Sequence, residues 1–197
     1  MSNPKLAIVI GSVRPNRFAA HAAEWIEEIA RQRGDFDVEL VDLKDYPMPL
    51  FAEAASPLYA PSKKEVARRW QAKLAEFDAF IFTAAEYNHG PTAVLKNALD
   101  YAYAEWSNKP VAFVGYGGVG GSRAVEQLRL NVIELQMAPI RHEVNIAREP
   151  FLGILQKDRS LNDYEYLVRS REAMFDHLAW WGEALKAARQ TAGRAAA

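Results

Sequence analysis

Short apolar segments recur along the chain and are separated by longer stretches of mixed polarity. Three of them, at 6–10, 79–83 and 111–114, are unbroken apolar runs, while 38–43 and 140–146 place apolar residues among polar ones. An unbroken run indicates a strand covered on both faces, and alternation indicates a more exposed strand. The pattern therefore predicts five β-strands.

Apolar residues at helical spacing follow each of these segments. The predicted helices lie near 19–33, 63–76, 95–102, 125–135 and 167–185. The segment 46–62 holds four prolines and is expected to be a connecting loop. Five alternations of strand and helix predict one α/β domain over 1–197, with a frayed tail at 189–197.

A five-stranded parallel sheet with helices on both faces commonly has the doubly wound strand order 2-1-3-4-5. Ligands of such sheets bind beyond the carboxyl ends of the strands, where the winding reverses between strands 1 and 3. The loops after the first, third and fourth strands are therefore the places to look for chemistry.

Composition narrows the kinds of chemistry that the chain can perform. Its formal net charge is -1, and its basic residues are interspersed with acidic ones, which argues against nucleic acid as a partner. The absence of cysteine excludes thiolate nucleophiles and cysteine-based metal sites, so redox chemistry needs a bound cofactor. The four histidines lack metal-ligand spacing, and no metal site is expected. No apolar run approaches the ~20 residues of a membrane span, and a cytoplasmic location is expected.

The loop after the first strand has the features of a phosphate site. It contains Ser12, Arg14, Asn16 and Arg17 directly before a predicted helix. Unpaired N–H groups and the dipole at a helix start favour an anion, and arginine can bind a phosphate through two hydrogen bonds. A triphosphate-binding Walker pattern is absent. The alternative is a capped helix with two solvated arginines.

The loop after the third strand brings polar and aromatic residues to the switch point. Glu86, Tyr87, Asn88 and His89 follow one another there, and they offer backbone donors and a flat side chain to a planar ring. The alternative is a plain helix entry in which Asn88 or Thr92 caps the next helix. His89 is the histidine best placed for a substrate pocket.

The loop after the fourth strand is unusually rich in glycine. Five glycines occur in the seven positions 115–121, among them Gly117, Gly118 and Gly120, and they let backbone approach a ligand closely. The spacing also matches the dinucleotide fingerprint G-x-G-x-x-G, which keeps a nicotinamide dehydrogenase open as an alternative. That fingerprint normally lies in the first βαβ unit, however, and not after a fourth strand.

Together these loops resemble the NADPH-dependent FMN reductase family of quinone and azo reductases. The resemblance rests on the motifs at 11–14, 86–90, 95–100 and 116–122, and it spans residues 5–145. It implies a flavodoxin-like fold that holds the FMN phosphate with Ser12, Arg14 and the loop to Arg17. It also implies that residues 86–88 lie along the isoalloxazine ring, and that Gly117, Gly118 and Gly120 cover its other polar edge.

The resemblance also implies the reaction and the assembly. Hydride would pass from NADPH or NADH to flavin N5, and then to a quinone, an azo compound or free flavin in a ping-pong cycle, with no catalytic side chain required. A homodimer or homotetramer is implied, with Met48, Phe51 and Tyr59 as rim residues of a neighbouring site. A flavodoxin-type electron carrier and a dehydrogenase without flavin remain the alternatives.

Overall fold

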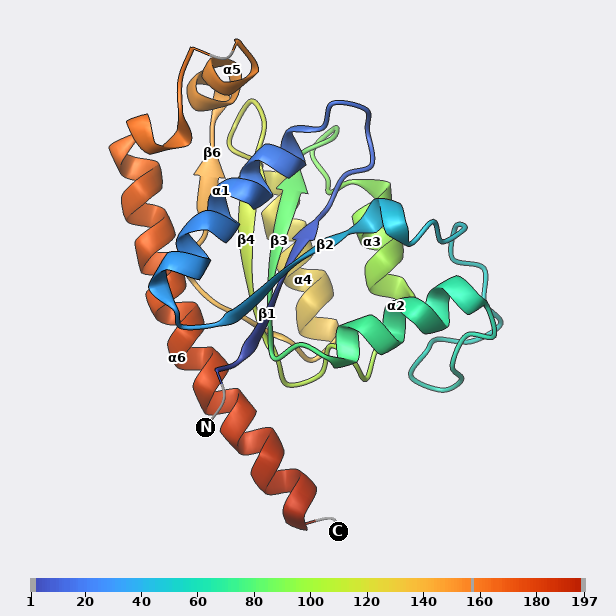
Figure 1. Cartoon of the computed structure of the whole chain (residues 1–197). Coiled ribbons are helices and arrows are strands. Elements are labelled where there is room, and N and C mark those ends of the chain that lie inside the picture. Colours follow the sequence, from blue (N-terminus) through green and yellow to red (C-terminus); the bar gives the residue numbers. More distant parts are fainter. Residues whose placement is uncertain (1–2, 157, 196–197) are drawn as a thin grey trace.

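The computed structural model describes residues 3–156 and 158–195. Strands and helices alternate along the chain, and the strands point the same way (Figure 1). In chain order the elements are β1 (Lys5–Ile10), α1 (Phe18–Arg33), β2 (Asp37–Asp42), the 3-10 turn η1 (Leu43–Asp45), α2 (Glu65–Ala75), β3 (Ala79–Ala85), α3 (Ala93–Asp100), β4 (Pro110–Tyr116), α4 (Ser122–Glu134), β5 (Ala138–Pro139), β6 (Val144–Ile146), α5 (Arg148–Gln156), the 3-10 turn η2 (Leu161–Asp163) and α6 (Glu165–Ala195).

The sheet has the order that the sequence predicts. Its strands run β2-β1-β3-β4-β5, every pairing is parallel, and β6 also pairs with β4. Because β1 and β3 are neighbours at the centre, the winding reverses between them. The loops that follow β1, β3 and β4 therefore meet at one edge of the sheet.

The fifth strand differs from the prediction of a single strand at 140–146. It is divided into β5 and β6, and residues 140–143 between them are not in a strand. Arg129 on α4 explains the break, because its guanidinium donates to the carbonyl oxygens of Ile140 at 2.7 Å and Arg141 at 3.2 Å. Alternation in the sequence indicates which side chains are buried, but it does not show which carbonyls a distant arginine will bind.

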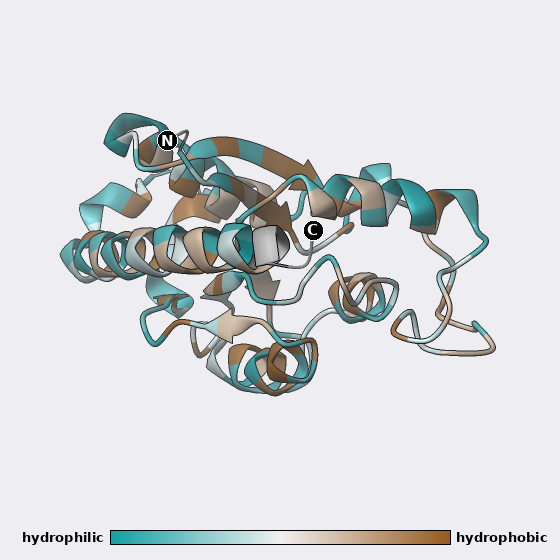
Figure 2. Ribbon diagram, turned by 90° about the horizontal axis from the view of Figure 1, so that it is seen from below, coloured by the Kyte–Doolittle hydropathy of each residue, from teal (hydrophilic) through white to brown (hydrophobic). Residues whose placement is uncertain are grey.

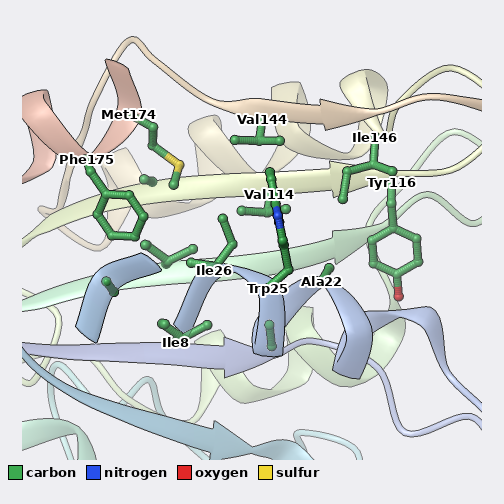
Figure 3. Close-up of a cluster of buried hydrophobic side chains, with 14 of the residues drawn as sticks. Ile8, Ala22, Trp25, Ile26, Val114, Tyr116, Val144, Ile146, Met174 and Phe175 are labelled. Carbon is green, nitrogen blue, oxygen red and sulfur yellow. The ribbon is translucent and has the colours of Figure 1, made fainter. Parts of the chain in front are cut away.

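Two apolar layers hold the sheet between its helices. On one face α1 and α6 pack Trp25, Ile26 and Phe175 against the sheet (Figure 3). On the other face α2, α3 and α4 cover a second cluster that includes Trp70 and Trp106. The strands in the middle are largely hydrophobic, and hydrophilic residues gather on the outer helices (Figure 2). Burial on both faces explains the unbroken apolar runs of β1, β3 and β4.

Two further features lie outside the predicted elements. The short helix α5 and the turn η2 stand between β6 and α6, in a segment for which no element is predicted. Helix α6 continues to Ala195, while the last two residues of the expected tail lie outside the described residues. Among the described helices, none combines the length and hydropathy needed to cross a membrane.

Candidate functional site

A cavity of about 270 Å³ lies where the loops after β1, β3 and β4 meet. The carboxyl ends of these strands point to the same edge of the sheet, and α5 lies beyond the end of β6 (Figure 1). The cavity thus joins all three loops that the sequence singles out to the added helix α5. Its lining consists of Arg14, Pro15, Asn16, Arg17, Phe18, Ala85, Glu86, Tyr87, Tyr116, Gly117, Phe151 and Leu155.

Gly11 fixes the start of the first loop against β3 and α3. Its N–H donates to Thr83 Oγ1 at 3.1 Å, and its carbonyl accepts a hydrogen bond from Thr92 Oγ1 at 2.6 Å. A Cβ at this position would stand 2.2 Å from the carbonyl oxygen of Thr83, so only glycine fits. Thr92 also caps α3 by accepting from the Leu95 N–H at 3.2 Å, as the sequence allows.

The loop from Ser12 to Arg17 presents unpartnered backbone donors. In the described part of the chain, the N–H groups of Val13, Asn16 and Arg17 have no protein acceptor. The helix α1 that follows has no side-chain cap and no acidic residue in its first turn. Asn16 has a positive φ of 51°, which gives the loop a concave turn. Uncapped N–H groups at the start of a helix suit an anion such as phosphate.

The two arginines of this loop have different surroundings. Arg17 forms an ion pair with Asp42 at the end of β2, and it also donates to the Ser12 carbonyl oxygen at 3.0 Å. Its guanidinium therefore braces the loop and is already neutralised. Arg14 is exposed and lies 5.5 Å from the centre of the Tyr87 ring. Arg14 is thus the cation of this loop that is left to meet a ligand.

Hydroxyl groups link the first loop to the other two. Ser12 is buried, and its Oγ lies 3.2 Å from the hydroxyl oxygen of Tyr87. The Tyr116 side chain at the end of β4 lies beside the α1 start, with its ring 5.1 Å from that of Phe18. Burial raises the pKa of Tyr116 well above its ordinary value, so its hydroxyl stays protonated. The hydroxyl-bearing side chains of Ser12, Tyr87 and Tyr116 therefore lie together where the first loop meets the other two.

The loop after β3 is anchored by a buried carboxylate. The Glu86 side chain is only 5% exposed, and it accepts from Arg123 Nε at 2.6 Å and from the Arg123 backbone N–H at 3.1 Å. Burial alone would raise the pKa of Glu86, but the hydrogen bonds and charge of Arg123 hold it below its usual value. The carboxylate is thus bound to the start of α4. The residues on either side of it, Ala85 and Tyr87, line the cavity.

The turn itself uses two residues with left-handed backbone. Asn88 has φ 52° and His89 φ 70°, and Tyr87 and Gly90 exchange backbone hydrogen bonds across the turn. His89 Nε2 lies 2.7 Å from an Arg123 guanidinium nitrogen, and it accepts there because a guanidinium only donates. Of the two residues that the sequence offers as caps of α3, Asn88 and Thr92, it is Thr92 that caps the helix.

The glycine-rich loop forms a turn at residues 117–121, which we call the glycine turn, and it is held by hydrogen bonds within itself and to β6. Gly117 donates to the Ile146 carbonyl at 3.2 Å, and Gly120 donates to the Gly117 carbonyl at 3.1 Å. The Gly118 N–H has no protein acceptor within the described residues, and no atom stands within 4 Å of where its Cβ would be. Of the three glycines singled out from the sequence, Gly118 is therefore the one with both an available donor and open space.

Six of the residues predicted for the cofactor site line the cavity, namely Arg14, Asn16, Arg17, Glu86, Tyr87 and Gly117. The other four lie in the same three loops but are not part of the lining, namely Ser12, Asn88, Gly118 and Gly120. The sequence argument did not single out Tyr116 and Phe151, which line the cavity, or Arg123, which binds Glu86. The Phe151 ring on α5 stacks on Tyr116 with 6.3 Å between ring centres. Among the described residues, no group of three or more acidic, histidine or cysteine side chains could hold a metal ion.

These residues fit FMN as the bound group. A phosphate needs hydrogen-bond donors and positive charge, which the uncapped α1 start and Arg14 supply. A planar ring needs backbone that can approach it closely. Gly117, which has a φ of 142° and no side chain, permits such an approach. Both features line one cavity.

Known proteins resemble this chain in sequence. The profile of the NADPH-dependent FMN reductase family matches residues 4–150. An NAD(P)H-dependent FMN reductase of Schizosaccharomyces pombe is 35% identical over 150 residues, which are 74% of this chain and 75% of the relative. An FMN-dependent NADPH-azoreductase of Staphylococcus saprophyticus is 28% identical over 83% of this chain and 88% of its own.

Structural comparison supports the fold. The flavoenzyme NAD(P)H:(acceptor) oxidoreductase FerB of Paracoccus denitrificans superposes with a TM-score of 0.72 at 20% identity, covering 92% of this chain and 98% of its own. This likeness confirms the flavodoxin-like architecture. The family profile, matching residues 4–150, and the sequence relatives lead to one conclusion: the chain belongs to the NADPH-dependent FMN reductase family, whose cofactor is FMN and whose co-substrate is NAD(P)H.

Proposed function

We propose that this chain holds FMN in the cavity between its three loops and reduces small acceptors at the expense of NAD(P)H. Quinones, azo compounds and free flavin are the proposed acceptors. A 2-hydroxy-1,4-benzoquinone reductase of Burkholderia, 33% identical over 64% of this chain and 68% of its own length, supports the first class. The azoreductase relative supports the second. Bound FMN supplies the hydride-carrying chemistry.

One observation carries the proposal. The loop of residues 12–17, the loop after β3 and the glycine turn line a single cavity, at the point where the winding of the sheet reverses. In the proposed complex, Ser12, Arg14 and the backbone N–H groups of Val13, Asn16 and Arg17 bind the phosphate. Arg17 contributes through its backbone and by holding the loop in shape.

The remaining site residues orient and surround the ring in this proposal. The backbone of Glu86, Tyr87 and Asn88 lies along one edge, and Gly118 donates at the other, with Gly117 and Gly120 forming the turn. The Glu86 N–H already donates to the Tyr116 carbonyl at 3.2 Å and the Tyr87 N–H to the Gly90 carbonyl at 2.9 Å, so the donor at the first edge is the Asn88 N–H. His89 borders the place of the acceptor and takes no part in the transfer.

A ping-pong order follows if donor and acceptor use the same open face in turn. The test is to load the purified protein with FMN and to follow NAD(P)H oxidation against increasing quinone. Parallel double-reciprocal lines are expected, and converging lines would exclude the ping-pong order. A protein that turns yellow but does not oxidise NAD(P)H would favour an electron carrier. One that binds no FMN would favour a dehydrogenase without flavin.

We further propose a homodimer or homotetramer. The loop between η1 and α2 is tied down by Asn97, which accepts from the Phe51 N–H and donates to the Pro49 carbonyl, both at 2.8 Å. Phe51 thereby packs on the core, whereas Tyr59 is 82% and Leu50 79% exposed. Sedimentation analysis should give a mass of two or four chains, and a monomer at micromolar concentration would exclude the proposal. The expected cytoplasmic location stays a prediction from the sequence.

A further inference from the structure

Two hydrogen bonds connect the glycine turn to strand β6. Gly117 donates to the Ile146 carbonyl at 3.2 Å, and the Asn145 side-chain Nδ2 donates to the Gly120 carbonyl at 3.2 Å. We propose that Asn145 is a positioning residue, which holds this turn at the flavin edge and thereby sets the reduction potential of bound FMN. This inference rests on the proposed function.

The turn and Asn145 are in direct contact. Gly120 has a φ of 73°, and a Cβ built on it would stand only 2.8 Å from the Asn145 Cβ. Glycine is therefore required at position 120 both by its backbone conformation and by the side chain that faces it. A shift of Asn145 would be transmitted to the turn through its hydrogen bond to the Gly120 carbonyl.

The orientation of the Asn145 amide is fixed from its other side. The same Nδ2 donates to Glu143 Oε1 at 3.1 Å, and the Glu143 carboxylate forms an ion pair with Arg129 at 2.6 Å. Arg129 lies on α4, the helix that begins at Ser122 directly after the glycine turn. Three contacts therefore connect helix α4 back to the turn that precedes it: Arg129 to Glu143, Glu143 to Asn145, and Asn145 to Gly120.

This arrangement matters because the turn carries an available donor, the Gly118 N–H. Reduction of the flavin places negative charge at the N1 and O2 edge, and a preorganised backbone donor stabilises such charge. A loosened turn would weaken binding of reduced FMN more than binding of oxidised FMN. We expect the ratio of the two affinities to change about tenfold, which for a two-electron couple lowers the potential by about 30 mV.

The test compares variants of Asn145 and Glu143 loaded with FMN. Asn145→Leu keeps the side-chain volume but cannot donate, and Asn145→Ala is the second variant if the leucine protein folds poorly. The potential is measured by equilibration with a reference dye, and the Kd of oxidised FMN by fluorescence quenching. Either variant should show the more negative potential, with a Kd for oxidised FMN within about threefold of wild type.

Glu143→Gln is the matched control. The glutamine oxygen can still accept from Asn145, while the ion pair with Arg129 is lost. We therefore expect a lower melting temperature but an unchanged potential, a combination that a merely structural role of Asn145 would not produce. Potentials of the Asn145 variants equal to wild type would overturn the inference alone. Failure of the wild-type protein to bind FMN would instead overturn the proposed function beneath it.

Discussion

Replacing Arg123 by alanine would leave the buried Glu86 carboxylate without its ion pair. The Glu86 side chain is 5% exposed and that of Arg123 is 42% exposed, so the carboxylate depends on the pair more than the guanidinium does. The Arg123 Nε–Oε1 distance is 2.6 Å, and alanine would remove this bond while the backbone bond to Oε2 could remain.

The expected loss of folding stability can be estimated from these contacts. A hydrogen bond to a charged group contributes about 1.5–3 kcal/mol, and the exposure of Arg123 to solvent reduces the gain. We expect the free energy of unfolding to fall by about 2 kcal/mol at pH 7. In a domain of this size, 1 kcal/mol corresponds to about 2–4 °C, so the melting temperature should fall by about 4–8 °C.

The loss should also depend on pH. The pKa of Glu86 in the folded chain lies below its ordinary value of 4.5. A group with a lowered pKa stabilises the fold above its unfolded-state pKa, and this contribution disappears as the pH falls through the folded-state value. The difference between Arg123→Ala and wild type should therefore be full at pH 7 and smaller at pH 4.

Urea denaturation of the FMN-free protein at both pH values measures this effect. Arg169→Ala is the matched control, since Arg169 and its partner Glu165 are 71% and 81% exposed, and we expect it to cost less than about 0.5 kcal/mol. The double change Glu86→Gln with Arg123→Ala should recover part of the stability, because no charge is then buried. If Arg123→Ala costs no more than the control, or costs the same at pH 4, this reasoning is wrong.

Three more outcomes can be measured. Arg14→Ala should raise the Kd for FMN by about ten- to a hundredfold in fluorescence titrations, with Arg14→Lys in between, and an unchanged Kd would remove the proposed phosphate contact. Gly121→Ala should lower the melting temperature more than Gly34→Ala. Both glycines have φ 73°, but an added Cβ lies 2.5 Å from β4 backbone at Gly121 and meets nothing within 4 Å at Gly34; equal losses would contradict this. Burial and the nearby His177 lower the pKa of His142, so its stabilising contribution is lost as the pH falls below about 6.5. His177→Gln should make stability fall less between pH 7 and pH 5 in urea titrations, and an equal or steeper fall would argue against the coupling.

Local signals in the sequence were enough for most of the fold. A few adjacent residues were enough to predict the buried strands β1, β3 and β4. The same holds for the end of α1, where Gly34 has a φ of 73°. The fifth strand was harder, because Arg129 removes its middle carbonyls from the ladder. Helix α5 was missed because nine residues with a proline and a glycine give no clear helical period.

The candidate site shows the same division between local and distant information. The three loops were found because each follows its strand directly, and strand order brings them together. The division of labour between Arg14 and Arg17 was not predicted, because it depends on Asp42, which is 25 positions from Arg17. The pairing of Glu86 with Arg123 joins residues 37 positions apart, and no spacing rule connects them.

Thr92 joins the loop of residues 12–17 and helix α3 into one cooperative unit. Its hydroxyl holds the Gly11 carbonyl and also caps α3, so neither segment can open without losing a bond that the other uses. Local opening of the loop should therefore carry the first turn of α3 with it. Adding phosphate-bearing ligand would then slow amide hydrogen exchange in that turn, at a distance from any contact with the ligand itself.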